Sequence, residues 1–395
     1  MTLHPHWGHA DLLEALARAR LRGSLPAALL IHGSRGVGKQ HLALWLARLL
    51  LCPAPTPRGP CEECDSCRRA VKLEHPDLHW YFPLSRPKGV STPDKLAQAL
   101  EEARGEVLSE LRENPLRASV GGEPKSLYLA AARTLRRQAH RRPSSGERQV
   151  FLIAEAEALA PQESSSEAAN ALLKLLEEPP SGTVLILTSS EPGRLLPTIR
   201  SRTTQLHLPP LSREEVSDFL VRVAQVEEGE AHRAAAISHG AIGRALGFVG
   251  DGHDPGPLEE TRKAALRLLS AALAPTLGPA FQVAGSFQPV GARGLFELLD
   301  FLEEWLRDLA VATCQPREGR GGQWDAEVFE EVLARWSIHP SSVTRAIQAT
   351  DAAREMAAGN VNPQLLIFGL LRDLREELVG QPHGTGSRRH HGQTK

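Results

Sequence analysis

Short apolar runs alternate with helical patterns through the first half of the chain. The apolar runs cover residues 29–32, 150–153 and 183–188. Residues 41–51 and 167–178 instead place apolar side chains at helical spacing, and Pro179-Pro180 ends the second helix. Strands that alternate with helices favour an α/β fold, in which helices cover both faces of a parallel sheet. We expect the ligand of such a sheet at the carboxyl ends of its strands.

After residue 211 the pattern is helical throughout. Short helices are expected over 211–250, and the Gly- and Pro-rich stretch at 250–257 has the composition of a linker. A bundle is predicted over 257–380 from amphipathic helices at 258–274, 294–314, 325–338, 341–358 and 363–378. We therefore expect three domains, at 1–210, 211–250 and 257–380, with a polar insertion at about 86–124 and a disordered tail at 381–395.

Charge and hydropathy narrow the class of protein. Lys and Arg total 46 against 47 Asp and Glu, so the net charge of −1 gives no global positive field toward nucleic acid or an anionic membrane. No apolar run approaches the roughly 18 residues of a membrane span, and the first residues lack the basic-then-apolar order of a signal peptide. We therefore expect a cytoplasmic protein without a membrane partner, in which any DNA contact is local or shared.

A phosphate-binding sequence follows the first apolar run. Gly33, Gly36, Gly38 and Lys39 fit a loop whose backbone N–H groups surround phosphates while the lysine reaches the terminal ones. Such a loop normally continues with Ser or Thr, whose hydroxyl coordinates magnesium, and here the residue is Gln40. ATP binding is therefore possible, and the alternative is a glycine loop retained only as a tight turn.

A second magnesium contact is also missing from the sequence. It normally comes from an Asp that ends the next core strand, followed by a Glu that orients the attacking water. The run at 150–153 is instead followed by Ala154 and Glu155. Because phosphoryl transfer depends on the metal to neutralise charge on the phosphates, we predict that magnesium-dependent hydrolysis at this site is inefficient.

Four of the five cysteines form a compact pattern directly after the phosphate-loop helix. Cys52, Cys61, Cys64 and Cys67 have the spacing C-x8-C-x2-C-x2-C. Four thiolates suit a closed, tetrahedral structural zinc site. An iron–sulfur cluster and free thiols are the alternatives, although the fourth cysteine and proline of a cluster run are absent downstream. Cys314, alone in a helical pattern, is expected to be a small core residue.

Two longer motifs carry a resemblance to a known family. Residues 170–180, N-A-L-L-K-L-L-E-E-P-P, and residues 195–202, L-L-P-T-I-R-S-R, resemble the clamp-loader subunits of bacterial DNA polymerase III. The cysteine pattern and His75-Pro76-Asp77 are similar to the same family. The resemblance covers residues 3–211 strongly and the later helices more loosely. It implies an AAA+ fold, with the zinc module at 52–67, a helical lid at 211–250 and an all-helical collar at 257–380 that holds a ring together.

The family resemblance distinguishes two kinds of subunit. The family includes ATPase subunits of gamma or tau type and a non-hydrolysing subunit of delta prime type. Gln40 and Ala154 make this chain similar to the delta prime type. In the family, the arginine of a Ser-Arg-Cys motif projects into the ATP site of the neighbouring subunit. Arg202, preceded by Ser201, falls on that position, with Thr203 in place of the Cys. An arginine finger raises the rate of phosphoryl transfer by a factor of about 10³ to 10⁵. The alternative is that Arg202 only forms a surface ion pair.

Two further positions match the family's nucleotide sensors. Thr188 ends the third apolar run and matches a polar residue that reads the phosphate, while Arg244 matches the sensor arginine of the lid. Both are expected at the nucleotide site together with Glu155. The alternative is an ordinary strand-end threonine and an ordinary helix-surface arginine.

The resemblance implies a role in assembly. The expected partners are gamma or tau ATPase subunits and a delta subunit, with the sliding clamp and primer–template DNA reached through the complex. One alternative is an active ATPase subunit of gamma or tau type. Another is a stand-alone zinc-containing nucleic-acid-binding protein that uses Arg58, Arg68, Arg69 and Lys72, but this segment lacks an aromatic stacking platform.

Overall fold

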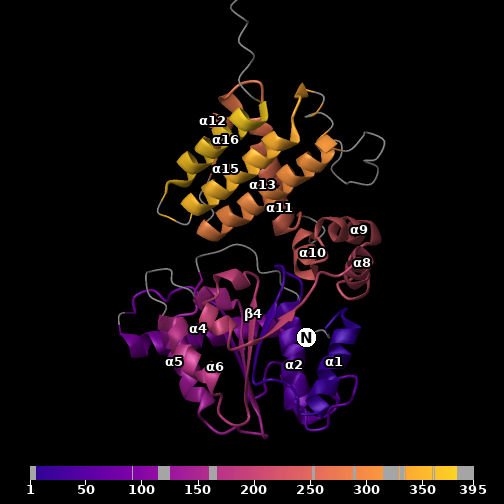
Figure 1. The fold of residues 1–395 in the computed structure, drawn as a ribbon, viewed down its shortest axis with the longest axis vertical. Helices are drawn as coiled ribbons and strands as arrows, with labels where there is room; N and C mark the ends of the chain where they lie inside the picture. The colour runs from indigo at the N-terminus through magenta and orange to yellow at the C-terminus, as the bar shows by residue number, and fades with distance from the viewer. Residues whose placement is uncertain are drawn as a thin grey trace, which may run out of the picture. The chain divides into compact units, whose positions relative to one another are not determined.

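The computed structural model describes residues 6–90, 92–113, 125–159, 167–250, 254–287, 291–314, 329, 333, 335–357, 359 and 361–379. The chain forms two compact units, which are described separately. Unit 1 is Met1–Ser119 with Pro124–Gly256, and unit 2 is Val120–Glu123 with Pro257–Lys395. The predicted linker at 250–257 coincides with the boundary at Gly256, and the helices at 211–250 belong to the same unit as the sheet (Figure 1). The predicted disordered tail at 381–395 and most of the predicted helix at 325–338 lie outside the described residues.

A five-stranded parallel sheet forms the centre of unit 1, in the order β2-β3-β4-β1-β5. Its strands are β1 (Ala28–His32), β2 (Leu78–Tyr81), β3 (Gln149–Ile153), β4 (Thr183–Ser189) and β5 (Thr204–His207). The predicted α/β fold is therefore confirmed. Because all strands run in one direction, the residues that follow β1, β3 and β4 meet at one edge of the sheet.

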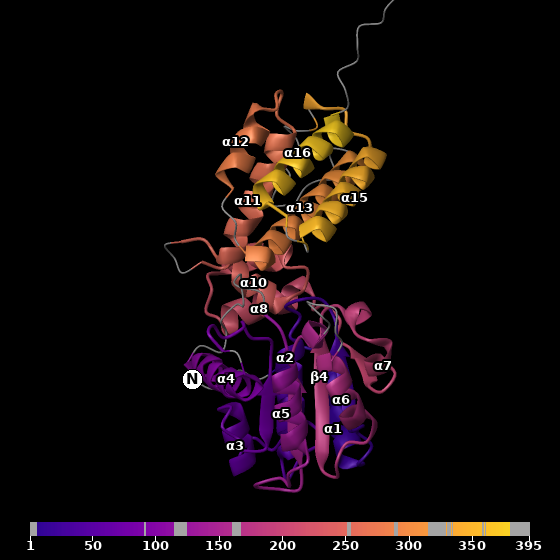
Figure 2. The same cartoon turned by 90° about the vertical axis from the view of Figure 1, so that its left-hand side faces the viewer.

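Helices cover both faces of the sheet. Before the lid they are α1 (Ala10–Leu21), α2 (Lys39–Leu51), α3 (Asp65–Val71), α4 (Pro93–Glu113), α5 (Leu129–Ala139), α6 (Glu167–Glu177) and α7 (Pro197–Arg200). Side chains alternate along β1: Leu29 and Ile31 pack in a core with α2, whereas Leu30 packs in a second core with α5 and α6. Figure 2 shows α5 and α6 alongside β4. These two apolar layers fix the edge of the sheet at which the phosphate loop lies.

Three short helices follow the sheet in unit 1, over the segment that was predicted to be the lid. They are α8 (Arg213–Arg222), α9 (Glu228–Ile237) and α10 (Ile242–Phe248). A capping box begins α8, because the Ser212 side chain accepts from the Glu215 N–H and the Glu215 side chain accepts from the Ser212 N–H. Gly240 has a φ of +75°, and a Cβ there would lie 2.2 Å from the carbonyl oxygen of Leu211. Only glycine allows this close approach between the start of α10 and the chain entering the lid.

Unit 2 is a helical bundle among its described residues. Its helices are α11 (Pro257–Ala272), α12 (Gly278–Ser286), α13 (Gly291–Cys314), α15 (Pro340–Ala357) and α16 (Pro363–Val379). Trp305 of α13 is 2% exposed, and its indole N–H donates to the carbonyl oxygen of Arg262 at 3.1 Å. The prediction that Cys314 is a core residue was wrong, since the side chain at the end of α13 is exposed. Within the described ranges, none of the helices is both long enough and apolar enough to span a membrane.

Candidate functional site

The predicted phosphate loop joins β1 to α2. Gly36 and Gly38 have φ values of +79° and +101°, in the region that favours glycine, and Gly38 caps the first turn of α2. Lys39 is only 7% exposed, and its Nζ donates to the carbonyl oxygens of Gly33 at 2.9 Å and Ser34 at 2.7 Å. The loop therefore wraps around the lysine ammonium, next to the N-terminus of a helix that favours anions.

Burial changes the basicity of this lysine. It lowers the pKa of Lys39 to about 8, and the carboxylates of Glu157 and Glu155 oppose this effect. Loss of water disfavours the charged ammonium unless an anion compensates it. A phosphate bound in the loop would provide such an anion and raise this pKa.

The positions that normally hold magnesium offer no charged oxygen. Gln40 is in the first turn of α2 and carries a neutral amide. Ala154 follows β3, is 1% exposed, and packs its methyl group in the core cluster that includes α2. The position of the expected aspartate is therefore filled by buried hydrocarbon, and the loss of magnesium binding stays a prediction.

The structure brings Glu155 and Thr188 together beside this position. Glu155 has a φ of +48°, and its backbone N–H donates to the Thr188 hydroxyl oxygen at 3.2 Å. Thr188 is 2% exposed near the end of β4. The threonine hydroxyl is therefore used to hold the turn after β3. Whether it also reads a phosphate stays a prediction.

Glu157 is a site residue to which the sequence analysis assigned no role. It lies in the short 3₁₀ helix Ala156–Leu159, and its Oε1 accepts from the backbone N–H of Ser190 at 3.0 Å. Of the acidic groups, it has the largest effect on the pKa of Lys39. The sequence feature that could have identified Glu157 is its position two residues after Glu155, close to the same edge of the sheet.

The start of α10, in the predicted lid segment, contacts the phosphate loop. The backbone N–H of Gly243 donates to the carbonyl oxygen of Gly36 at 2.8 Å. A Cβ on Gly36 would lie 2.9 Å from the backbone nitrogen of Arg244, so these two segments are in main-chain contact. Arg244 is thus beside the loop, where the sensor arginine was predicted, and its guanidinium lies 5.8 Å from the ring centre of Phe248.

His6 also borders the loop and was not predicted as a site residue. Its Cε1 lies 3.7 Å from where a Cβ on Gly38 would be. Burial, together with the nearby His9 and His41, lowers the pKa of His6 to about 3. The imidazole is therefore neutral at physiological pH and adds no positive charge to the loop.

Arg202 lies in a separate part of unit 1, just after α7. Its Nε donates to Oε1 of Glu177 at 2.6 Å, and its Nη1 donates to the carbonyl oxygen of Thr198 at 3.0 Å. Ser201 donates its hydroxyl to the same carbonyl at 3.2 Å. Thr203, in the position of the motif's cysteine, is buried and donates to the carbonyl oxygen of Ile199 at 3.1 Å. Thr203 is therefore a packing residue, while Arg202 is partly exposed.

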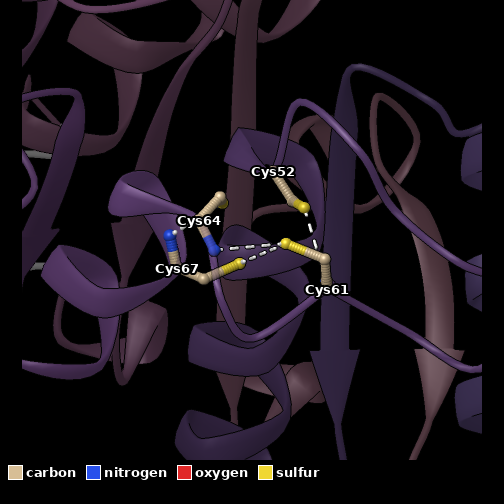
Figure 3. A group of neighbouring side chains, drawn as sticks. All are labelled: Cys52, Cys61, Cys64 and Cys67. Carbon is tan, nitrogen blue, oxygen red and sulfur yellow. Dashed lines mark hydrogen bonds between the residues drawn. The ribbon is translucent and has the colours of Figure 1, made fainter.

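The four predicted metal ligands converge on one point. Their sulfur atoms all lie within 4.8 Å of one another, and Figure 3 shows Cys52, Cys61, Cys64 and Cys67 grouped around a common centre. Cys52 caps the end of α2 and Cys64 caps the start of α3, so the two helices carry the ligands toward each other. Sulfur atoms at such separations fit a tetrahedral ion with Zn–S distances of about 2.3 Å.

Backbone groups polarise the same sulfur atoms. The N–H groups of Cys61, Cys64 and Cys67 donate to the sulfurs of Cys52, Cys61 and Cys64 respectively, each at 3.4 Å. The donation from Cys64 is the main reason that the pKa of Cys61 falls to about 7, whereas burial raises the pKa of Cys67. Thiolates held by backbone N–H groups are suited to a metal ion. The cluster therefore fits zinc, which stays a prediction.

Comparisons with known proteins agree on the first unit. A relative named DNA polymerase III subunit delta′, from Pseudomonas aeruginosa, is 34% identical over 215 residues, which are 54% of this chain and 53% of the relative. A DNA polymerase III subunit tau from Salmonella typhimurium is 31% identical over 230 residues, 58% of this chain and 29% of that protein. This chain thus spans about half the length of the delta′ relative that it matches.

A solved structure and a family model complete the comparison. The gamma subunit-related protein of DNA polymerase III from Thermotoga maritima is 15% identical, with a TM-score of 0.38; the match covers 92% of this chain and 99% of that one. The model of the family described as DNA polymerase III, delta subunit, matches residues 8–212, more than half of the chain and all of the segment that holds the phosphate loop, the cysteines and Arg202. The chain belongs to this DNA polymerase III delta subunit family.

Proposed function

We propose that this chain is a non-hydrolysing, delta prime-like subunit of the DNA polymerase III clamp loader. The observation that carries the proposal is the buried methyl group of Ala154 beside an otherwise intact phosphate loop. Gln40 adds a second substitution for the same ion. The delta′ name of the Pseudomonas aeruginosa relative supports this assignment.

The chemistry of the loop supports the proposal that ATP hydrolysis at this site is slow. Magnesium would need anionic or hydroxyl oxygens from the protein, and the two usual positions provide an amide and a methyl group. Lys39 can still contact phosphate, so nucleotide binding without efficient turnover is consistent with the site. The chain then contributes to the complex through its surface.

Arg202 provides such a contribution. Its guanidinium is planar and 32% exposed. Projected into the ATP site of a neighbouring subunit, it would stabilise charge on the transferring phosphoryl group. The proposed neighbours are gamma or tau ATPase subunits and a delta subunit, held through the helical bundle of unit 2. The complex would open the sliding clamp and place it on primer–template DNA.

The assignment is tested by steady-state ATP hydrolysis of the purified chain. We expect no turnover above that of the Lys39→Ala variant, because magnesium lacks its protein ligands. The competing assignment is an active subunit of gamma or tau type, which would hydrolyse ATP at this loop. The similarity to a tau subunit supports this alternative. Turnover of several molecules per minute that Lys39→Ala abolishes would favour that competitor.

A further inference from the structure

Two neighbouring segments hold the guanidinium of Arg202. Its Nε and Nη2 both bind Oε1 of Glu177, the last residue of α6, and its Nη1 binds the carbonyl oxygen of Thr198 in α7. Each nitrogen of the guanidinium thus has one protein partner. One further N–H on each terminal nitrogen has no partner among the described residues, and the side chain is 32% exposed.

The place of Glu177 in its helix makes this contact informative. A carboxylate at the C-terminal end of a helix faces the negative end of the helix dipole, which disfavours it. Glu177 ends α6, and Glu178 follows it directly. The helix itself therefore gives no reason for an acid here. The ion pair with Arg202 offsets the unfavourable position of Glu177, whereas Glu178 makes no such contact.

Fixing an arginine before it meets its ligand has a physical advantage. A free arginine side chain samples many rotamers, and ordering it costs conformational entropy when it binds. Here Glu177 and Thr198 already order the guanidinium plane. A planar guanidinium with free N–H groups can bind two oxygens of a phosphoryl group at once.

We propose that Glu177 is a positioning residue for Arg202, holding the guanidinium so that its outward N–H groups meet the phosphoryl oxygens of a nucleotide in the neighbouring subunit. This inference rests on the proposed function. Glu177 touches neither the nucleotide nor the reacting atoms in this arrangement. Its effect is to reduce the entropy that Arg202 loses in the transition state.

The test uses the full chain reconstituted with the ATPase and delta subunits of the same organism. DNA-stimulated ATP hydrolysis is measured as kcat and KM for the wild type and for Arg202→Ala, Glu177→Ala, Glu177→Gln and Glu178→Ala. We expect Glu177→Ala to lower kcat about tenfold with little change in KM. Glu177→Gln retains an oxygen that can accept from Nε, so it should restore most of that loss.

Two controls separate positioning from a general effect on the helix. Glu178→Ala removes the same charge from the same helix end and should leave kcat unchanged. In the Arg202→Ala background, Glu177→Ala should have no further effect, since the group that it positions is gone. Thermal unfolding and size-exclusion chromatography establish that each variant folds and joins the complex.

The outcomes distinguish this inference from the function on which it rests. If Arg202→Ala lowers kcat and Glu177→Ala does not, the positioning role is wrong and the arginine finger stands. A rise in kcat for Glu177→Ala also overturns the inference, because the carboxylate would then restrain the arginine. If Arg202→Ala itself has no effect, the finger assignment and the inference fail together.

Discussion

Single side chains in unit 1 bear on the proposal that the phosphate loop has lost its metal chemistry. The Lys39 ammonium donates to the carbonyl oxygens of Gly33 and Ser34, so these two bonds hold the loop around it. Ala154 replaces a potential metal ligand with a methyl group that adds to the core. The substitution therefore favours folding at a position where an unpaired buried carboxylate would be costly.

Asp77 shows a different use of a buried charge. It is 2% exposed and accepts hydrogen bonds from the backbone N–H groups of Ser144 and Ser145 at 2.5 and 2.9 Å, and from the Ser145 hydroxyl at 2.8 Å. Burial raises the pKa of Asp77, but these hydrogen bonds outweigh it, so the pKa is lowered overall. The aspartate of His75-Pro76-Asp77 thus holds the turn between α5 and β3.

The lowered pKa of Asp77 predicts a pH-dependent stability. A carboxyl whose pKa is lower in the folded than in the unfolded state stabilises the fold above its unfolded pKa. This stabilisation begins to fall below the unfolded pKa of about 3.9 and is lost as pH falls through the lower folded pKa. We expect Asp77→Asn to lower the free energy of unfolding by about 2 kcal/mol at pH 7, with a smaller difference from the wild type at pH 3.

Denaturant unfolding at both pH values checks this expectation. Asp218→Asn is the matched control, because Asp218 is exposed and only pairs with Arg222 on the surface of α8. It should change the free energy of unfolding by less than about 0.5 kcal/mol. An Asp77→Asn effect that is equal at both pH values would contradict the role of the carboxylate charge.

Among the elements, α2 connects two sites that the sequence analysis treated separately. It begins at Lys39 in the phosphate loop and ends at Leu51, directly before the metal-ligand candidate Cys52. Its thirteen residues include nine that are buried, among them Leu42 and Leu46 in the core next to β1. A metal ion in the cysteine cluster would therefore secure one end of the helix whose other end carries the phosphate loop.

Loss of one cysteine should then release the metal and loosen this helix end. We expect Cys64→Ser to lower the zinc content, measured by mass spectrometry of the purified protein, from about one ion per chain to well below it. The midpoint of thermal unfolding should fall by several degrees because metal-binding free energy is lost.

The exposed Cys314 provides the matched control for the zinc prediction. Cys314→Ser removes one thiol outside the cluster and should leave both the zinc content and the unfolding midpoint unchanged. A chelator should lower the midpoint of the wild type to that of Cys64→Ser. Unaltered zinc in Cys64→Ser, or iron in place of zinc, would contradict the assignment.

At the scale of the whole molecule, the chemistry is concentrated in one unit. The phosphate loop, the cysteine cluster and Arg202 all lie in unit 1, whereas the described part of unit 2 is a helical bundle. This division fits the proposal of a subunit that joins a ring through its bundle and acts on a neighbour through Arg202. Neither role depends on hydrolysis at its own loop.

A clamp-loading assay tests the whole assembly. Leaving this chain out of the mixture of ATPase and delta subunits should reduce loading of the clamp on primed DNA by about tenfold or more, and adding it should restore loading. Arg202→Ala should join the complex but restore loading poorly. Arg194→Ala removes another exposed arginine, paired with Glu191, and should behave as the wild type. Full loading in the absence of the chain would contradict the proposed role.

Local patterns were sufficient to predict much of the first unit. The strand, loop and helix around Lys39 and the convergence of the four cysteines depend on residues close together in the sequence. Turn chemistry and helical periodicity act over this range, so the sequence by itself determined the α/β class and the candidate chemistry. Strand β2, with only four residues and two of them buried, was not predicted because so short a segment has no clear period.

Contacts between distant segments were decided only by the tertiary structure. The hydrogen bond from Gly243 to Gly36, the position of His6 beside Gly38, and the pairing of Arg202 with Glu177 join parts of the chain that share no local pattern. Each depends on how helices and loops meet at the surface of the sheet, which periodicity does not encode. The sequence thus determined which chemical groups are present, and the packing of α6, α7 and α10 decided which of them meet.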